Sequence, residues 1–348
     1  MRRLGILLPT ALVAVLLTAG PALACGGLIG PNGAVNLLRT STFAGYHDGV
    51  EHYVTAFEFA GGGGAFGSIT PLPDVPSSVE KGGDWTLQRL ALETSPVIEF
   101  AFPAGAASAD ARGAEELMKV RIDALDITVL RGGAADIGRW AKDHGFRLPP
   151  DAPEVLEFYA SRSPIFLAAA FDSEAAAELG QRVGDGTSVH VTIPTDNPWV
   201  PLRILALGKT GEERVEADVY LLTDRAPALL PSPKSAVGLR LDHSDAASAS
   251  LLDDLRSDRG MEWVPARAWL TKVAVDSSAA GLSYDLAIDA SGAGVPSRVD
   301  AGFDFLSTPI ELAGSIDAGR LLLAVFFSLV GVSGIWLMAR YRPEDALR

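Results

Sequence analysis

Five histidines and one cysteine are the side chains best suited to metal binding or nucleophilic chemistry in this 348-residue sequence. His47 and His52 lie close together, with Asp48 and Glu51 between them. Imidazole and carboxylate groups are usual zinc ligands, so this stretch is a candidate metal site. Zinc takes three or four protein ligands, however, and Asp48-Gly49 predicts a hairpin turn that leaves both histidines in solvent. We therefore assign no metal. The isolated His144, His190 and His243 are expected to be capping or surface residues rather than catalytic bases.

Cys25 directly follows an apolar leader. It is a candidate for a modified N-terminus, with three alternatives: a free or intermolecularly disulfide-linked thiol, a lipidated cysteine, or a catalytic thiol. Ala22-Leu23-Ala24 fits ordinary signal peptidase, and the order of Ala22 and Leu23 is the reverse of what lipidation requires. No general base is indicated beside the thiol, which disfavours a catalytic role. We therefore expect a free or intermolecularly disulfide-linked thiol, ahead of a lipidated cysteine and then a catalytic thiol.

A possible binding surface is indicated by an aromatic residue and two prolines in stiff segments. Trp199 lies between Pro198 and Pro201, and Pro71 and Pro73 belong to the segment TPLPDVP. An exposed tryptophan in a rigid loop can bind a ligand or an envelope polymer. Core packing is the default for a side chain of this size. Because proline cannot donate to a β-ladder, the proline segment should leave the sheet or lie on its edge.

Nucleotide and hydrolase motifs are not complete. Gly208-Lys209-Thr210 would need a glycine at position 203 to form a phosphate loop, and Arg203 stands there. No G-x-S-x-G sequence occurs. We therefore expect no bound cofactor, and catalytic residues remain unknown.

Both ends of the chain carry signals for export and membrane anchoring. Arg2 and Arg3 followed by the apolar run Leu4 to Leu17 predict a signal peptide over residues 1–24. Residues 321–339 carry no charge, and a helix of that length covers ~28 Å, close to the ~30 Å hydrocarbon thickness of a bilayer. We expect a transmembrane helix over 318–340. Arginines concentrate after it, so 341–348 is predicted to be a cytoplasmic tail.

Residues 25–317 then form the extracytoplasmic part, which is strongly acidic. Up to position 319 it holds 23 Lys and Arg against 41 Asp and Glu, a net charge near −18. This charge disfavours nucleic acid as a partner, because nucleic acid rewards basic patches. It also supports solubility.

Sequence periodicity predicts an α+β fold with a mainly antiparallel β-sheet and a few short helices, plus the C-terminal transmembrane helix. Helices are expected from Asp84 to Glu93, from Ala134 to His144 and from Ala152 to Ala160. Two subdomains with a boundary near 225–265 are one possibility. The expected strands include 34–41, 52–59, 127–130, 165–171, 188–193, 202–207, 215–222, 266–275 and 282–288.

Three long stretches together resemble a bacterial family, the domain of unknown function numbered twenty-three thirty. They are YHDGVEHYVTAFEFAGGGGAFGSITPLPDVP, DIGRWAKDHGFRLPPDAPEVLEFYASRSPIFLAAAFD and VTIPTDNPWVPLRILAL, and CGG follows the leader. The likeness spans residues 25 to about 275. It implies an exported and often membrane-anchored protein, and it supplies no catalytic residue.

Three functions from different classes fit these observations. The first is a noncatalytic single-pass envelope protein whose outer domain binds a partner protein or wall component. The second is an extracytoplasmic hydrolase or metal-dependent enzyme whose site is assembled from distant residues. The third is an accessory subunit that acts through its transmembrane helix in a membrane complex.

Overall fold

The computed structural model of the chain describes residues 22–23, 27–31, 33–34, 39–58, 66–94, 116–181 and 186–303. These lie in one compact unit that ends at Phe303. Cys25, most of the expected signal peptide, and the segments 318–340 and 341–348 lie outside the described residues. Among the helices that the structure describes, none is long and apolar enough to cross a membrane.

Within the described residues, the largest sheet (sheet A) has eight strands in the order β15-β16-β13-β4-β5-β11-β7, with β1 added beside β4. Its pairings are antiparallel, except that β4 runs parallel to β13 and to β1. The strands are β1 (Ala22–Leu23), β4 (Arg39–His47), β5 (Val50–Glu58), β7 (Ser78–Lys81), β11 (Gly186–Pro194), β13 (Arg214–Thr223), β15 (Leu239–Ala246) and β16 (Trp269–Ser278).

Two further sheets complete the described β-structure. The six-stranded sheet B has the order β3-β2-β6-β10-β9-β8, and a three-stranded sheet has the order β12-β17-β14. The strands of sheet B are β2 (Gly27–Gly30), β3 (Gly33–Ala34), β6 (Phe66–Leu72), β8 (Glu116–Ile122), β9 (Leu125–Arg131) and β10 (Ile165–Phe171). The small sheet contains β12 (Trp199–Val200), β14 (Ala228–Leu230) and β17 (Leu286–Asp289).

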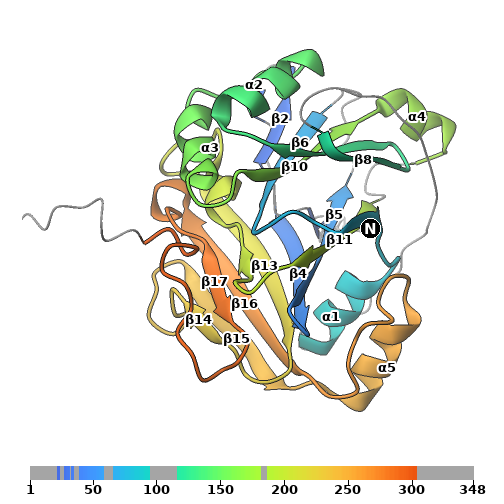
Figure 1. Ribbon diagram of the computed structural model, residues 1–348, viewed down its shortest axis with the longest axis vertical. Helices are drawn as coiled ribbons and strands as arrows, with labels where there is room; N and C mark the ends of the chain where they lie inside the picture. Colours follow the sequence, from blue (N-terminus) through green and yellow to red (C-terminus); the bar gives the residue numbers. More distant parts are fainter. Residues whose placement is uncertain are drawn as a thin grey trace, which may run out of the picture. The chain divides into compact units, whose positions relative to one another are not determined.

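Short helices cover the outer faces of the two large sheets (Figure 1). The helices α2 and α3 pack on sheet B, and α1 and α5 pack on sheet A. A shared apolar core joins the two sheets, with Val219 from sheet A and Ile127 from sheet B among its members. The helical segments are α1 (Thr86–Thr94), α2 (Ala134–Asp143), α3 (Ala152–Ala160), α4 (Ser173–Glu178), α5 (Ala249–Ser257) and the 3₁₀ turns η1 (Arg203–Ala206) and η2 (Ala279–Gly281).

The described residues confirm the expected α+β class, since they form β-sheets with a few short helices. Three local sequence patterns also form the elements that they predict. The β4–β5 hairpin turns at Asp48 and Gly49, which both adopt the positive φ angles that this dipeptide tolerates. The apolar run of β10 is buried on both faces, between the shared core and the helices outside sheet B. In α2, Ile137, Trp140 and Ala141 all face the core, as their helical spacing predicts.

The prediction of a strand at 202–207 is wrong, since the chain forms the 3₁₀ turn η1 there. The reason is that side chains capture its backbone donors. The amides of Leu202 and Arg203 donate to the Asp285 carboxylate, and that of Ile204 donates to the Tyr159 hydroxyl. These groups are then not available to a neighbouring strand.

The strands on either side of residues 225–265, the region suggested as a subdomain boundary, pair with each other. β13 lies before it and β16 after it, and the two strands pair along their whole length from Arg214–Ser278 to Thr223–Trp269. Both sides of the region therefore contribute to sheet A.

The helix predicted from Asp84 begins at Thr86, as α1, and its cap is supplied from far along the sequence. The buried Asp258 carboxylate accepts hydrogen bonds from the amides of Asp84 and Trp85 and from the Thr86 hydroxyl. Because Asp258 ends α5, it ties the two helices on sheet A together. A Cβ at Gly83 would lie 2.1 Å from this carboxylate, so only glycine fits beside it.

We expect Asp258→Ala to lower the free energy of unfolding by about 1–3 kcal/mol, because the three donors at the start of α1 and the Arg259 amide lose their buried acceptor. Asp253→Ala is the matched control, since Asp253 lies on α5 with its side chain 72% exposed. Urea unfolding of both variants measures the difference. Equal stability of the two variants would show that the cap contributes nothing.

Candidate functional site

A pair of histidines on the helix-covered face of sheet A is the candidate site. His52 comes from β5 and His190 from β11, two adjacent strands. Nδ1 of His52 lies 3.0 Å from Nε2 of His190, which is a hydrogen-bond distance. The fold thus joins one of the residues predicted from sequence with a histidine 138 positions away that was expected to be isolated.

The rings of the pair are held by the segment that follows α5. The Trp263 ring stacks on His52 with a centroid separation of 3.8 Å and an angle of 4° between the planes. Gly45 lies opposite His52 in β4, and a Cβ there would come within 2.2 Å of the Trp263 ring. A Cβ at Gly260 would lie 3.0 Å from Nδ1 of His190. Packing therefore fixes the orientation of both imidazoles.

Both histidines are uncharged at neutral pH. Burial lowers the pKa of His52 to about 3, with further lowering by the nearby His190 and His47. Burial also lowers the pKa of His190 to about 4, and the carboxylate of Glu262 opposes this shift only in part. A neutral imidazole has one free lone pair, so each ring can accept a proton or bind an ion.

His47 is not part of this hydrogen-bonded pair. Its Nδ1 lies 2.7 Å from Asp224, and its Nε2 lies 3.5 Å from Asp48. Through the part of the chain that the structure describes, no group of three or more His, Cys, Asp or Glu is placed to hold a metal ion. The stretch His47–His52 therefore does not form a ready-made zinc site, because its two histidines point to different partners.

Glu51, the neighbour of His52, points to the opposite face of β5 and is fully buried. Neither carboxyl oxygen makes a hydrogen bond of normal geometry. Burial raises the pKa of Glu51 to about 8, although the backbone N–H of Trp199 lowers it slightly. The carboxyl group is consequently protonated at neutral pH.

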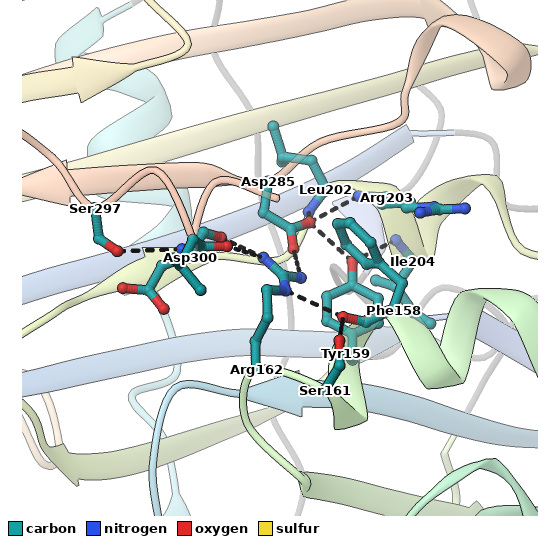
Figure 2. Close-up of polar contacts among 11 residues, drawn as sticks. Phe158, Tyr159, Ser161, Arg162, Leu202, Arg203, Ile204, Asp285, Ser297 and Asp300 are labelled. Atoms are coloured by element: carbon teal, nitrogen blue, oxygen red, sulfur yellow. Dashed lines mark hydrogen bonds and ion pairs between the residues drawn. The ribbon is translucent and has the colours of Figure 1, made fainter. Parts of the chain in front are cut away.

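A second buried polar cluster centres on Asp285, just before β17 (Figure 2). One carboxylate oxygen accepts hydrogen bonds from the Tyr159 hydroxyl and from the amides of Leu202 and Arg203 at 2.7–3.0 Å. The other oxygen lies 2.6 Å from the guanidinium of Arg162. Burial and the Asp285 carboxylate raise the pKa of Tyr159, so its hydroxyl keeps the proton that it donates.

Arg162 extends the Asp285 cluster to the end of the described unit. Its guanidinium donates to the backbone oxygens of Val299 and Asp300 and lies 4.0 Å from the centroid of the Phe158 ring. The cluster therefore links α3, η1, β17 and the segment before Phe303 (Figure 2). The polar groups of Asp285, Arg162 and Tyr159 are engaged in hydrogen bonds within the protein. The cluster is therefore a structural connection between distant segments.

The possible binding surface at Trp199, Pro71 and Pro73 is not formed. Trp199 is 2% exposed and stacks near Tyr159, so it belongs to the core. Pro71 lies inside β6, where it pairs with Phe166 of β10 and is buried. Pro73 is half-buried just past the strand. β2 pairs only with Gly67 to Ile69, so β6 has a partner on one side only at Pro71, where a proline is better tolerated than between two paired strands.

Sequence reasoning missed the residues that the tertiary structure brings together. Asp285, Arg162 and Tyr159 lie in segments of ordinary composition, and His190 looks like one more polar residue in a strand. One signal was present for His190. It lies at the centre of an alternating strand, where a polar side chain on a covered face needs a partner.

Comparisons with solved structures give only a distant likeness to baculovirus P35. The structure of a mutated baculovirus P35 after caspase cleavage has 9% identity and a TM-score of 0.38, and covers 72% of this chain and 99% of that one. Baculovirus P35 itself gives 10% identity, a TM-score of 0.38, and coverage of 72% and 96%. These values are too low to support a statement on fold or function.

Relatives in sequence are more informative. A comparison with curated proteins gives no match. A family model described as "Uncharacterized protein conserved in bacteria (DUF2330)" matches residues 20–288, a range that includes His52, His190, Arg162 and Asp285. Because the match spans more than half of the chain, the protein belongs to the DUF2330 family.

Proposed function

We propose that the protein is exported and anchored by a single C-terminal transmembrane helix, and that its folded domain binds a partner protein or wall component outside the membrane. The observation that carries this proposal is the charge-free run of residues 321–339, followed by arginines and preceded in the chain by a leader at residues 1–24. A domain held at a membrane surface acts where partners are close by, because anchoring raises the effective concentration.

Two features of the folded unit support a binding role. Its acidic charge, near −18 for residues 25–319, keeps it soluble and favours partners with basic patches. The helices on both outer faces leave sheet edges and loops as contact surfaces. One example is the edge strand β15, in which buried or half-buried side chains alternate with exposed ones from Leu239 to Ser244 and the last residues are exposed. A role as accessory subunit of a membrane complex uses the same topology.

The topology is tested with a reporter that is active only in the cytoplasm, fused after Arg348. We expect activity, because the arginines after residue 339 hold the tail inside. The matched control is the same reporter fused after Phe303, which we expect to be inactive. Activity of the control fusion, or of neither fusion, would contradict the proposed topology.

The binding role is tested by cross-linking the full-length protein in its native membrane and identifying the products. We expect defined adducts with one partner. A protein truncated after residue 317 should not form these adducts, because it lacks the anchor that keeps the domain near its partner. Recovery of the protein alone, together with hydrolytic activity of the purified protein, would contradict a noncatalytic role and favour the enzyme hypothesis.

A further inference from the structure

Large apolar side chains are exposed at four positions in the part of the chain that the structure describes. Val237, Val295 and Val299 are 56–91% exposed, and the fourth position is Leu92 on α1. The three valines belong to segments near Phe303, the last described residue. Single exposed apolar side chains are ordinary, whereas several at one end of a domain mark a surface that meets a protein or a membrane.

Structural contacts connect these valines with the end of the described unit. The Tyr284 hydroxyl donates to the backbone oxygen of Val237 at 3.0 Å, and the Tyr284 ring stacks on that of Phe303 with 6.2 Å between the centroids. Val299 lies in the turn that precedes Phe303. Val295 lies on the loop between β17 and this turn.

The Asp285 cluster fixes the turn that carries Val299. Arg162 donates to the backbone oxygens of Val299 and Asp300. The backbone N–H of Asp285 donates to the backbone oxygen of Ala301, which is fully buried. The chain therefore leaves the folded unit at a defined place.

The distance from this place to the expected transmembrane helix at 318–340 is limited by chain length. Fourteen residues, 304–317, connect the two. A chain of this length reaches at most ~50 Å when fully extended, and a random chain has a root-mean-square end-to-end distance of ~21 Å. A folded domain of ~280 residues has a radius of gyration of ~19 Å and a diameter of roughly 50 Å. The short connection thus favours orientations in which the end with Phe303 is nearest to the bilayer.

Charge favours the same orientation. Residues 290–303 contain one arginine and one aspartate, so their net charge is zero, whereas residues 25–319 carry a charge near −18. Anionic lipids repel acidic protein surfaces over short distances in salt. A neutral loop with exposed valines can therefore approach the lipid headgroups where acidic surfaces are disfavoured.

We propose that Val237, Val295 and Val299 form a membrane-contact surface, which lies against the phospholipid headgroups of the bilayer that holds the anchor. The proposal rests on the C-terminal anchor proposed above and adds the orientation of the domain. The helices α1 and α5 lie on the other side of the unit from β14 and β17 (Figure 1). That side then faces away from the membrane and is accessible to a partner.

The test measures how close two labelled positions lie to lipid in the full-length protein, incorporated into nanodiscs of phosphatidylcholine and phosphatidylglycerol. Cys25→Ser removes the only cysteine. An environment-sensitive fluorophore is then attached at Val295→Cys or, as matched control, at Leu92→Cys, an exposed apolar position on α1. Lipids with a nitroxide on the headgroup quench at short range, and we expect roughly threefold stronger quenching at position 295 than at position 92.

A second comparison separates contact through the valines from the proximity that the short connection alone imposes. Val237→Asp combined with Val299→Asp should lower the quenching at position 295 about twofold, because a carboxylate is costly to move from water into the apolar part of the interface. Both positions are exposed, so the fold should be retained. Leu92→Asp is the matched control and should leave the quenching at position 295 unchanged.

Three results would overturn the membrane contact while leaving the anchor in place. They are equal quenching at positions 92 and 295, no effect of the two aspartates, and shielding of position 295 from iodide without quenching by lipid. The last result would assign the valines to an interface with a second copy of the protein. Failure of the full-length protein to enter nanodiscs would instead contradict the anchor, and with it the membrane contact.

Discussion

Asp285→Ala is expected to lower the free energy of unfolding by about 3–5 kcal/mol, which exceeds the loss expected for Asp258→Ala. Asp285 is 0% exposed and pairs with Arg162, whose side chain is 7% exposed (Figure 2). Removal of the carboxylate leaves a buried guanidinium without its counterion. It also leaves the Tyr159 hydroxyl and two backbone amides without an acceptor. Urea unfolding followed by tryptophan fluorescence measures the loss.

Two further variants separate charge from geometry at Asp285. Asp285→Asn keeps the shape and one oxygen acceptor, so we expect a smaller loss than for alanine. Asp276→Ala removes one partner of the exposed Arg214–Asp276 pair and serves as the matched control, with little expected change because solvent screens that pair. If Asp285→Ala were no more destabilising than Asp276→Ala, the cluster would not be the connection between segments that we describe.

Glu51→Gln is expected to remove a pH dependence of stability that Glu51 imposes between about pH 4.5 and 8. The folded-state pKa of Glu51 is raised to about 8, whereas an unfolded glutamate titrates near 4.5. The folded state therefore holds a proton that the unfolded state has released. Stability is fully present below pH 4.5, falls as the pH rises toward 8, and is constant above it.

The expected size of this effect is on the order of 3 kcal/mol between pH 5 and 7.5, since each pH unit inside the window contributes up to about 1.4 kcal/mol. The measurement is the difference in unfolding free energy between the original protein and Glu51→Gln at several pH values, which cancels other titrating groups. Glu80→Gln is the matched control, because Glu80 is an exposed residue of β7 in the same sheet. A difference that stays constant with pH would show that Glu51 is charged in the folded protein.

Glu51 and His52 show why buried polar groups were not recognised from the sequence. Glu51 and His52 are neighbours, but a strand sends successive side chains to opposite faces. One faces the core between the sheets and the other faces the helices on sheet A. In the sequence, both lie beside His47 in one hydrophilic stretch, and the alternation of side chains along β5 separates them. The pairing of β5 with β11 then brings His190 to His52.

Elements with local signals could be predicted from the sequence. Asp48-Gly49 specified the β4–β5 turn, Gly145 took the positive φ angle expected after α2, and the apolar run of residues 165–171 became a doubly covered strand. Composition and periodicity were sufficient for the α+β class, because hydrophobic patterns of period 2 and 3.6 are properties of short segments. The family membership also follows from sequence.

The meeting of distant polar residues, in contrast, depends on the tertiary fold. His52 and His190 are 138 positions apart, and Arg162 and Asp285 are 123 apart. The strand predicted at 202–207 became a 3₁₀ turn because Asp285 and Tyr159 bind its amides. Contacts of this range depend on strand order and on which face each side chain takes. A single sequence encodes these only through the packing of the whole domain, so the candidate site is visible in the folded protein alone.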